Sequence, residues 1–105
     1  MEWKTSEEKR LIEAILVLSS TDDARCFFRD LMTRKEIDEF AKRFKTAEML
    51  SQKIPYAIIE KETGFSSTTV ARVAKWLKAE EGGYRRIIAR LNHHHNSCPA
   101  GKGLS

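Results

Sequence analysis

Apolar residues recur every three or four positions through most of the chain, which is the spacing of amphipathic helices. The first such stretch follows Thr5, which forms a capping-box pattern with Glu8 and predicts a helix to about Leu18. Ser20 or Thr21 is placed to cap a second helix, which has acidic residues in its first turn. The apolar positions of these two helices are Leu11, Ile12, Ile15, Leu16, Leu18, Ala24, Phe27, Phe28, Leu31 and Met32.

A second capping-box pattern, Thr33 with Glu36, predicts the start of a long amphipathic third helix. Pro55 cannot occupy a helix interior, so it separates this helix from a short fourth one, in which we expect Ile58 and Ile59 to face inward. The apolar positions of the third helix are Ile37, Phe40, Ala41, Phe44, Ala47, Met49 and Leu50.

Gly64 is placed to end the fourth helix, because glycine adopts the left-handed backbone of a helix C-terminus without strain. Ser66 or Ser67 then caps a fifth helix, which we expect to reach Glu81 before a pair of glycines. The apolar spacing predicts a sixth helix over residues 84–94. The residues expected to pack the fourth and fifth helices together are Ile59, Phe65, Val70 and Val73.

Length and composition favour one small all-α domain. The chain has 105 residues, 41% hydrophobic and 32% charged, with only five glycines and two prolines; this excludes a disordered acidic tail and disfavours a sheet protein. No uncharged run is long enough to span a membrane. Because Glu7 and Glu13 interrupt the N-terminal apolar stretch, we expect no secretory signal and a cytoplasmic location. We predict a domain over residues 1–92 and a disordered tail over residues 93–105.

The sequence offers little metal or catalytic chemistry. Three consecutive histidines, His93–His95, precede Cys98, but neighbouring side chains do not converge on one ion, so we expect no metal site. Cys26 adjoins two phenylalanines and is predicted to be a small buried hydrophobic side chain. No catalytic triad, carboxylate pair or glycine-rich phosphate loop is recognisable. We therefore expect no enzyme and no cofactor.

The charges are unevenly distributed. The net charge is +4, with a pI near 9.2, yet acidic residues outnumber basic ones over residues 1–33 and the reverse holds over residues 34–92. A basic segment of this kind suggests a polyanionic partner. Within it, two helices joined by a short glycine turn over about residues 55–79 match the spacing of a helix-turn-helix.

The second helix of this unit carries the candidate DNA contacts. Small hydroxyl side chains at its start allow close approach to a major groove, where Ser and Thr bond base edges. Basic side chains one and two turns later suit phosphate contacts, and no acidic residue occurs between Ser66 and Ala79. The predicted DNA-contacting residues are Ser66, Ser67, Thr68, Thr69, Arg72 and Lys75.

Other interpretations of this segment remain open. Two helices with a glycine turn also occur in plain helical bundles, and Ser or Thr at a helix start is ordinary capping. Glu60 and Glu62 add negative charge to the first helix of the unit. A protein–protein adaptor with a degenerate helix-turn-helix is therefore the alternative function.

The runs LMTRKEIDEFAKRFKTAEML and PYAIIEKETGFSSTTVARVAKWL resemble the tryptophan repressor superfamily. The stretch E-T-G-x-S-x-T-x-[VI]-x-R-V is most similar to its YerC/YecD-like branch, and the resemblance extends from about Phe28 to Leu91. It implies a six-helix all-α fold, an intertwined homodimer, and a transcription regulator, expected to be a repressor. The helix starting near Ser67 of each subunit would then enter the major groove of a pseudo-palindromic operator, with Ser67, Thr68 and Thr69 at the base-contacting positions.

The resemblance also implies an effector site. In tryptophan-responsive members two arginines sandwich the indole ring, and their positions fall on Arg43 and Arg72. The family's adjacent glycine is Val73 here, and a small residue three positions further on is Trp76. Both larger side chains reduce the space for a ligand, so we predict that free tryptophan is not the co-repressor. A regulator gated by another small molecule between Arg43 and Arg72 remains an alternative.

The same residues also have purely structural interpretations. Arg43 can pair with Glu39 or Glu36 on its own helix, and Arg72 can be a phosphate contact without any ligand pocket. Trp3 and Trp76 are interpreted as core or interface aromatics.

Overall fold

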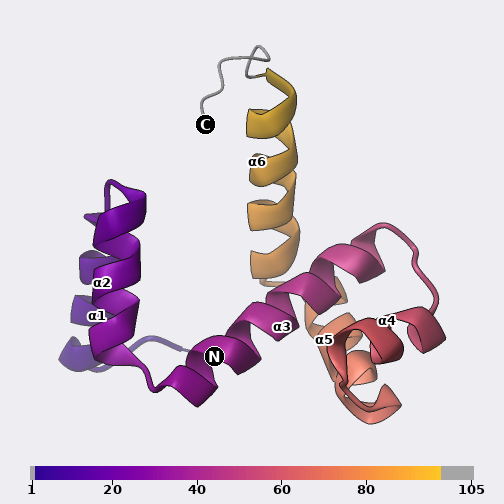
Figure 1. The fold of residues 1–105 in the computed structure, drawn as a ribbon. Coiled ribbons are helices and arrows are strands. Elements are labelled where there is room, and N and C mark those ends of the chain that lie inside the picture. The colour runs from indigo at the N-terminus through magenta and orange to yellow at the C-terminus, as the bar shows by residue number, and fades with distance from the viewer. Residues whose placement is uncertain (1, 98–105) are drawn as a thin grey trace. The chain divides into compact units, whose positions relative to one another are not determined.

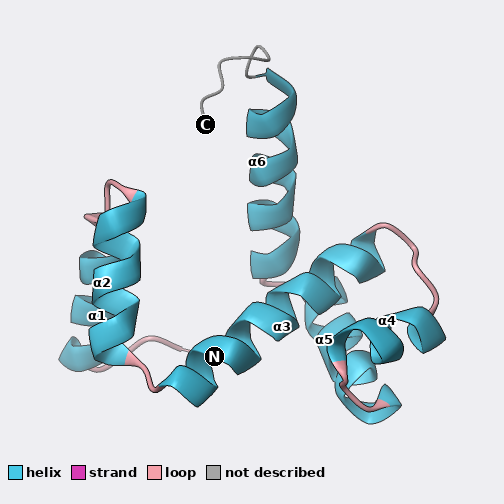
Figure 2. Ribbon diagram, in the orientation of Figure 1, coloured by secondary structure: helices cyan, strands magenta, loops and turns pink. Residues whose placement is uncertain are grey.

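The computed structural model describes residues 2–97 and contains six helices and no strand among them (Figures 1 and 2). This confirms the predicted all-α class. The helices are α1 (Ser6–Leu16), α2 (Thr21–Leu31), α3 (Arg34–Ser51), α4 (Tyr56–Thr63), α5 (Ser67–Lys78) and α6 (Gly83–Ser97). None of the helices in this part of the chain is both long enough and apolar enough to cross a bilayer.

The chain divides into two compact units, residues 1–38 and residues 39–105. The first contains α1, α2 and the start of α3, and the second contains the rest of α3 with α4, α5 and α6. The prediction of one domain over residues 1–92 stays a prediction.

The starts of the first two helices follow the predicted capping chemistry. The Thr5 hydroxyl accepts a bond from the Glu8 N–H, and the Glu8 carboxylate accepts one from the Thr5 N–H, both at 3.1 Å. Ser20 caps α2 by accepting from the Asp23 N–H at 3.0 Å. α1 ends earlier than predicted, because the N–H of Leu18 turns back to the carbonyl three residues before it in a tighter turn.

Neither α1 nor α2 buries a single residue. At the end of α1, Leu16 and Val17 are 76% and 75% exposed. Cys26 is exposed, so the prediction that it is buried is wrong. Its side of α2 lines an open concavity with Phe28 and Ile37, and nothing in this unit covers the thiol.

The third helix connects the two units and has well-defined ends. The capping box of Thr33 and Glu36 is present, with bonds of 2.9 and 3.1 Å. At the other end Lys53 has a left-handed φ of 65°. The N–H groups of Lys53 and Ile54 donate to the carbonyls of Leu50 and Met49, the pattern of a Schellman motif.

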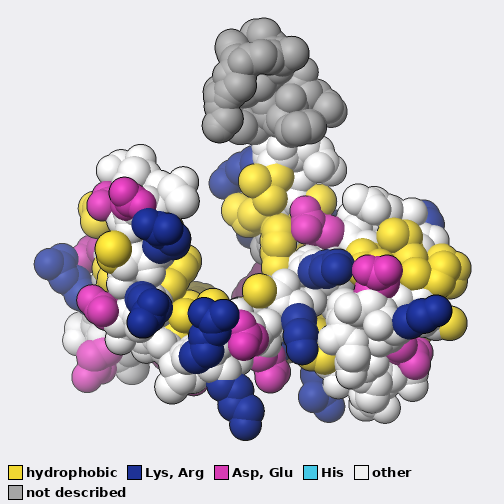
Figure 3. Space-filling model, in the orientation of Figure 1, with side chains coloured by type: hydrophobic (Ala, Val, Ile, Leu, Met, Phe, Trp, Pro, Cys, Tyr) yellow, Lys and Arg dark blue, Asp and Glu magenta, His cyan; other side chains and the backbone are white. Residues whose placement is uncertain are grey.

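The core of the second unit forms where α5 packs against α4 and α6. Ala47, Val73 and Ile88 are buried together, and the rings of Phe44 and Tyr84 lie 6.3 Å apart beside them. Hydrophobic side chains nevertheless remain visible on the surface of α6 (Figure 3). On this helix Ile87 and Leu91 are 45% and 47% exposed.

Ile59 and Val70 are fully buried in the same unit, and Phe65 is half-buried. Ile58 is 48% exposed, so the prediction that it faces inward is wrong. Successive residues of a helix point about 100° apart, and this short helix has one covered face. That face is occupied by Ile59.

Two predicted boundaries near the C-terminus differ from the structure. α5 ends at Lys78, before the predicted Glu81, because Ala79 has an extended backbone. α6 continues to Ser97, past residue 94, where the sixth helix was predicted to end, and its sequence contains no proline or internal glycine that would stop it. The disordered tail predicted over residues 93–105 stays a prediction. Residues 98–105 of that predicted tail lie outside the described residues.

Candidate nucleic-acid interface

The helix-turn-helix is formed by α4, a turn at Gly64 and α5. Gly64 has a φ of 79° and its N–H donates to the Glu60 carbonyl at 2.8 Å, which ends α4 as predicted. A Cβ placed on Gly64 would meet no atom within 4 Å, so the requirement for glycine comes from the backbone conformation and not from crowding.

Thr63 fixes the geometry of this turn and was not identified from the sequence. It is 4% exposed, and its hydroxyl donates to the Ile59 carbonyl at 2.8 Å while accepting from the Phe65 N–H at 3.1 Å. One hydroxyl therefore links the last turn of α4 to the residue after the glycine. The only local signal was a hydroxyl residue directly before the turn glycine.

Ser66 is the N-cap of α5. Its hydroxyl accepts from the Thr69 N–H at 3.3 Å and lies 3.2 Å from the Thr69 hydroxyl. Two of the predicted DNA-contacting hydroxyls are thus engaged with each other, and Thr69 is half-buried. The side chains of Ser67 and Thr68 are exposed beside this cap.

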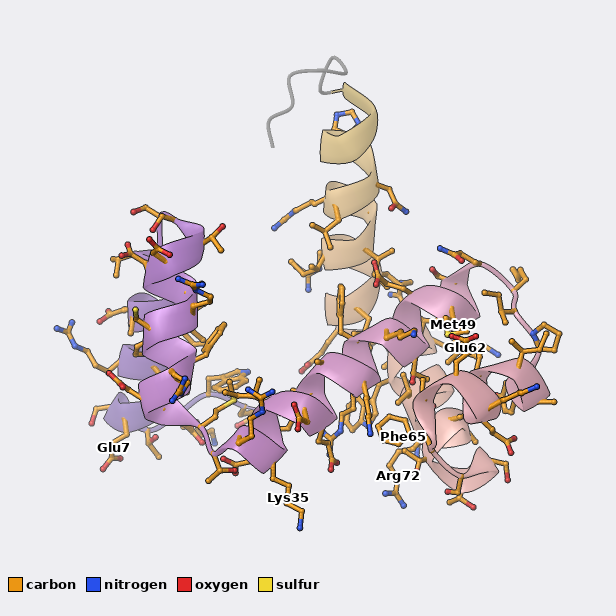
Figure 4. The ribbon with its side chains drawn as sticks, in the orientation of Figure 1. Glu7, Lys35, Met49, Glu62, Phe65 and Arg72 are labelled. Atoms are coloured by element: carbon orange, nitrogen blue, oxygen red, sulfur yellow. The ribbon has the colours of Figure 1, made fainter. Side chains whose placement is uncertain are left out.

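The outer face of α5 is basic. Arg72, Lys75 and Lys78 are exposed, and the helix contains no acidic residue. The Arg72 side chain extends away from the packed helices (Figure 4). Of the two acidic residues of α4, Glu62 is paired away from this face, because its carboxylate lies 3.4 Å from the ammonium group of Lys45 on α3.

The structure does not bring the predicted effector residues together within one chain. The Arg43 guanidinium pairs with Glu39 at 2.8 Å and lies 5.3 Å from the centre of the Phe40 ring, both on α3. Val73 is only 4% exposed and belongs to the core. Arg72 and Trp76 line a shallow concavity on α5 that does not include Arg43.

Neither tryptophan is in the core of the described chain, since Trp3 and Trp76 are 45% and 56% exposed. No group of three His, Cys, Asp or Glu side chains in the described part could hold a metal ion. His93 is exposed, but the side chains of His94 and His95 and the whole of Cys98 lie outside the described part.

Comparison with known proteins connects this geometry to a family. The model of the family described as Trp repressor protein matches residues 6–92. The uncharacterized protein YerC of Bacillus subtilis (strain 168) is 35% identical over 85 residues, which cover 81% of this chain and 82% of YerC.

Two solved structures share the fold. A TrpR like protein from Eubacterium eligens ATCC 27750 has a TM-score of 0.81 and 38% identity, covering 85% of this chain and 92% of that one. A putative Trp repressor from Staphylococcus aureus has a TM-score of 0.79 and 35% identity, covering 85% and 89%. These matches confirm the resemblance found in the sequence.

Proposed function

The chain belongs to the Trp repressor protein family, and from this premise we propose that it is a transcription regulator, acting as a repressor, that binds specific DNA through α5. The observation that carries the proposal is the outer face of α5. It begins with exposed hydroxyls, continues with exposed cations and contains no acidic residue. In this order the hydroxyls can contact base edges in a major groove and the cations can contact the flanking phosphates.

We propose that the first turn of α5 enters the major groove. Ser67 and Thr68 then reach base edges through their exposed hydroxyls, which can both donate and accept hydrogen bonds. Thr69 contributes its methyl group, since its hydroxyl is directed to Ser66. Arg72 and Lys75 bind phosphates and set the orientation of the helix.

The protein is proposed to act as a homodimer on a pseudo-palindromic operator. α1 and α2 bury no residue in the single chain, and apolar side chains of α6 are exposed, which a second copy can cover. A two-fold dimer presents two copies of α5, and successive major grooves on one face of DNA lie about 34 Å apart.

Free tryptophan is not the proposed effector. Val73 is packed against Ala47 and Ile88, so its methyl groups occupy space that a glycine would leave open. The Arg43 guanidinium already has Glu39 and Phe40 as neighbours. Addition of tryptophan is therefore expected to leave the affinity for DNA unchanged.

A salt series of gel shifts tests the proposal, with an operator found by genomic footprinting of the tagged protein. Arg72→Ala and Lys75→Ala should each weaken binding to every sequence. Each should reduce the slope of log affinity against log salt by about 2, because one phosphate contact is lost from each subunit of the dimer. Thr68→Ala should instead weaken operator binding more than random-DNA binding, by about 1–3 kcal/mol.

Lys9→Ala is the matched control, because Lys9 is an exposed cation on α1, outside the proposed interface. It should leave affinity and salt slope unchanged. Elution from heparin at low salt with an intact dimer would contradict DNA binding and favour the protein–protein adaptor.

A further inference from the structure

Trp76 is an unusual residue to find on the outer face of α5. It carries the largest apolar side chain of any amino acid, yet it is 56% exposed. It lies one turn after Arg72 and two turns after Thr68, so the three residues share one stripe of the helix. This stripe is continuous with the proposed reading surface.

The surroundings of Trp76 form a shallow basic concavity. Its volume is about 400 Å³, and it is lined by Thr68, Ala71, Arg72, Lys75 and Trp76. The side chain of Ala71 is small and leaves this space unfilled. The cations of Arg72 and Lys75 lie at its border. No acidic residue of α5 is present to neutralise them.

The charges of this concavity favour DNA over a second copy of the chain as the partner of the indole. A protein surface covering Trp76 would also remove water from Arg72 and Lys75, which is costly unless acidic groups are supplied. A DNA backbone supplies such an acid at every nucleotide. The exposed apolar residues of α6, Ile87 and Leu91, offer a second copy a surface elsewhere.

We propose that Trp76 contacts the DNA backbone beside the major groove, as an extension of the function proposed above and resting on it. The indole ring packs against a deoxyribose, and its Nε1–H donates to a phosphate oxygen. Indole is a donor without an acceptor, which matches a phosphate oxygen, an acceptor without a donor. Trp76 thereby limits the rotation of α5 about its own axis and positions Thr68 in the groove.

This role has a signature that separates Trp76 from its basic neighbours. A neutral side chain displaces no condensed cation, so its loss lowers affinity without changing the salt slope. Trp76→Ala should weaken binding to a random-sequence duplex about five- to tenfold, equivalent to a hydrogen bond with its packing contacts. Trp76→Phe retains the ring and loses the donor, so it should cause a smaller loss.

The test uses the full chain with Trp3→Phe, in which Trp76 is the single tryptophan. This protein is titrated with a random-sequence duplex of about 30 base pairs, long enough for two half-sites one helical turn apart. We expect the Trp76 emission to change and to become less accessible to acrylamide as DNA binds. Salt series of Trp76→Ala and Trp76→Phe, with folding checked by circular dichroism, complete the experiment.

The outcomes distinguish this inference from the proposed function. Unchanged Trp76 emission and unchanged affinity of Trp76→Ala, with Arg72→Ala still weakened, would overturn the inference and leave the function intact. Emission that responds to protein concentration and not to DNA would show that a second copy covers the indole. Failure of the Trp3→Phe protein and of the unmodified chain to bind any duplex would remove both proposals.

Discussion

At the scale of single residues, two buried threonines make different sets of hydrogen bonds. Thr46 and Thr63 each donate to the carbonyl four residues earlier, both at 2.8 Å. Only Thr63 also accepts a bond, from the Phe65 N–H outside its helix. The hydrogen bond of Thr46 therefore only gives its buried hydroxyl a partner within α3. The bonds of Thr63 also fix the path of the chain through the turn.

Replacing Thr63 by valine keeps the shape of the side chain but leaves the Phe65 N–H without this acceptor. We expect the free energy of unfolding to fall by about 1–3 kcal/mol, because the partly buried Phe65 N–H loses its partner and the buried bond to the Ile59 carbonyl is lost as well. Urea denaturation measures this loss. Thr63→Ser should recover much of it.

Thr46→Val is the matched control, because it removes a buried hydroxyl without depriving an N–H group of its acceptor. Its cost should not exceed about 1 kcal/mol. Equal losses for the two valine variants would show that Thr63 has no special role in the turn.

Residue-scale features were predictable where their cause is local. The caps at Thr5, Ser20 and Thr33 and the stop at Gly64 depend on chemistry within four residues, and the sequence displays that chemistry directly. The exposure of Cys26 was not predictable in this way, because it depends on which surface, if any, covers the residue.

At the scale of elements, two helices end with a residue in the left-handed region. α4 ends at Gly64 with a φ of 79°, and α3 is followed by Lys53 with a φ of 65°. A side chain at such a position costs about 1–2 kcal/mol, which glycine avoids. Introducing glycine after α3 and removing it after α4 should therefore have opposite effects on stability.

Lys53→Gly should stabilise the protein by about 0.5–1 kcal/mol, since the relief of strain exceeds the added flexibility of the unfolded chain. Gly64→Ala should destabilise it by about 1–2 kcal/mol, although the new methyl group meets no atom within 4 Å. Thermal denaturation of the two variants and of the wild type measures both changes in stability. A stabilising Gly64→Ala would contradict the left-handed turn.

Helix starts were predicted more accurately than helix ends. Four of the helices, α1, α2, α3 and α5, start at a hydroxyl cap, whereas α1 and α5 end in backbone turns that no residue type specifies. The stripe of α5 was also visible in the sequence, but its hydroxyl pair at Ser66 and its concavity at Trp76 required the three-dimensional arrangement.

At the scale of the whole molecule, the buried residues and the exposed apolar residues occupy different places. Among the residues whose burial the structure describes, every buried hydrophobic side chain belongs to the second unit: Ala47, Ile59, Val70, Val73, Ala74 and Ile88. α1 and α2 bury none. A single chain this small holds a modest core, and a second copy would enlarge it.

Leu91→Glu should convert the proposed dimer into a monomer with the 12.1 kDa mass of one chain. The carboxylate would be buried without a partner if a second copy covered α6. Sedimentation equilibrium measures the mass. Ile58→Glu is the matched control: Ile58 and Leu91 are 48% and 47% exposed, but Ile58 lies on α4.

A monomeric Ile58→Glu variant, or a Leu91→Glu variant that remains dimeric, would move the proposed interface away from α6. A wild-type mass of one chain at every concentration would remove the dimer from the proposal altogether.

The core around Ala47, Val73 and Ile88 has a genetic consequence, because one chain supplies all of it together with its own copy of α5. A chain with a damaged α5 can still fold and, as a dimer, still join an undamaged copy. Such a heterodimer would bind only one half-site of the operator. An Arg72→Ala allele expressed beside the wild type is therefore expected to be dominant and to derepress the target genes in proportion to its dosage.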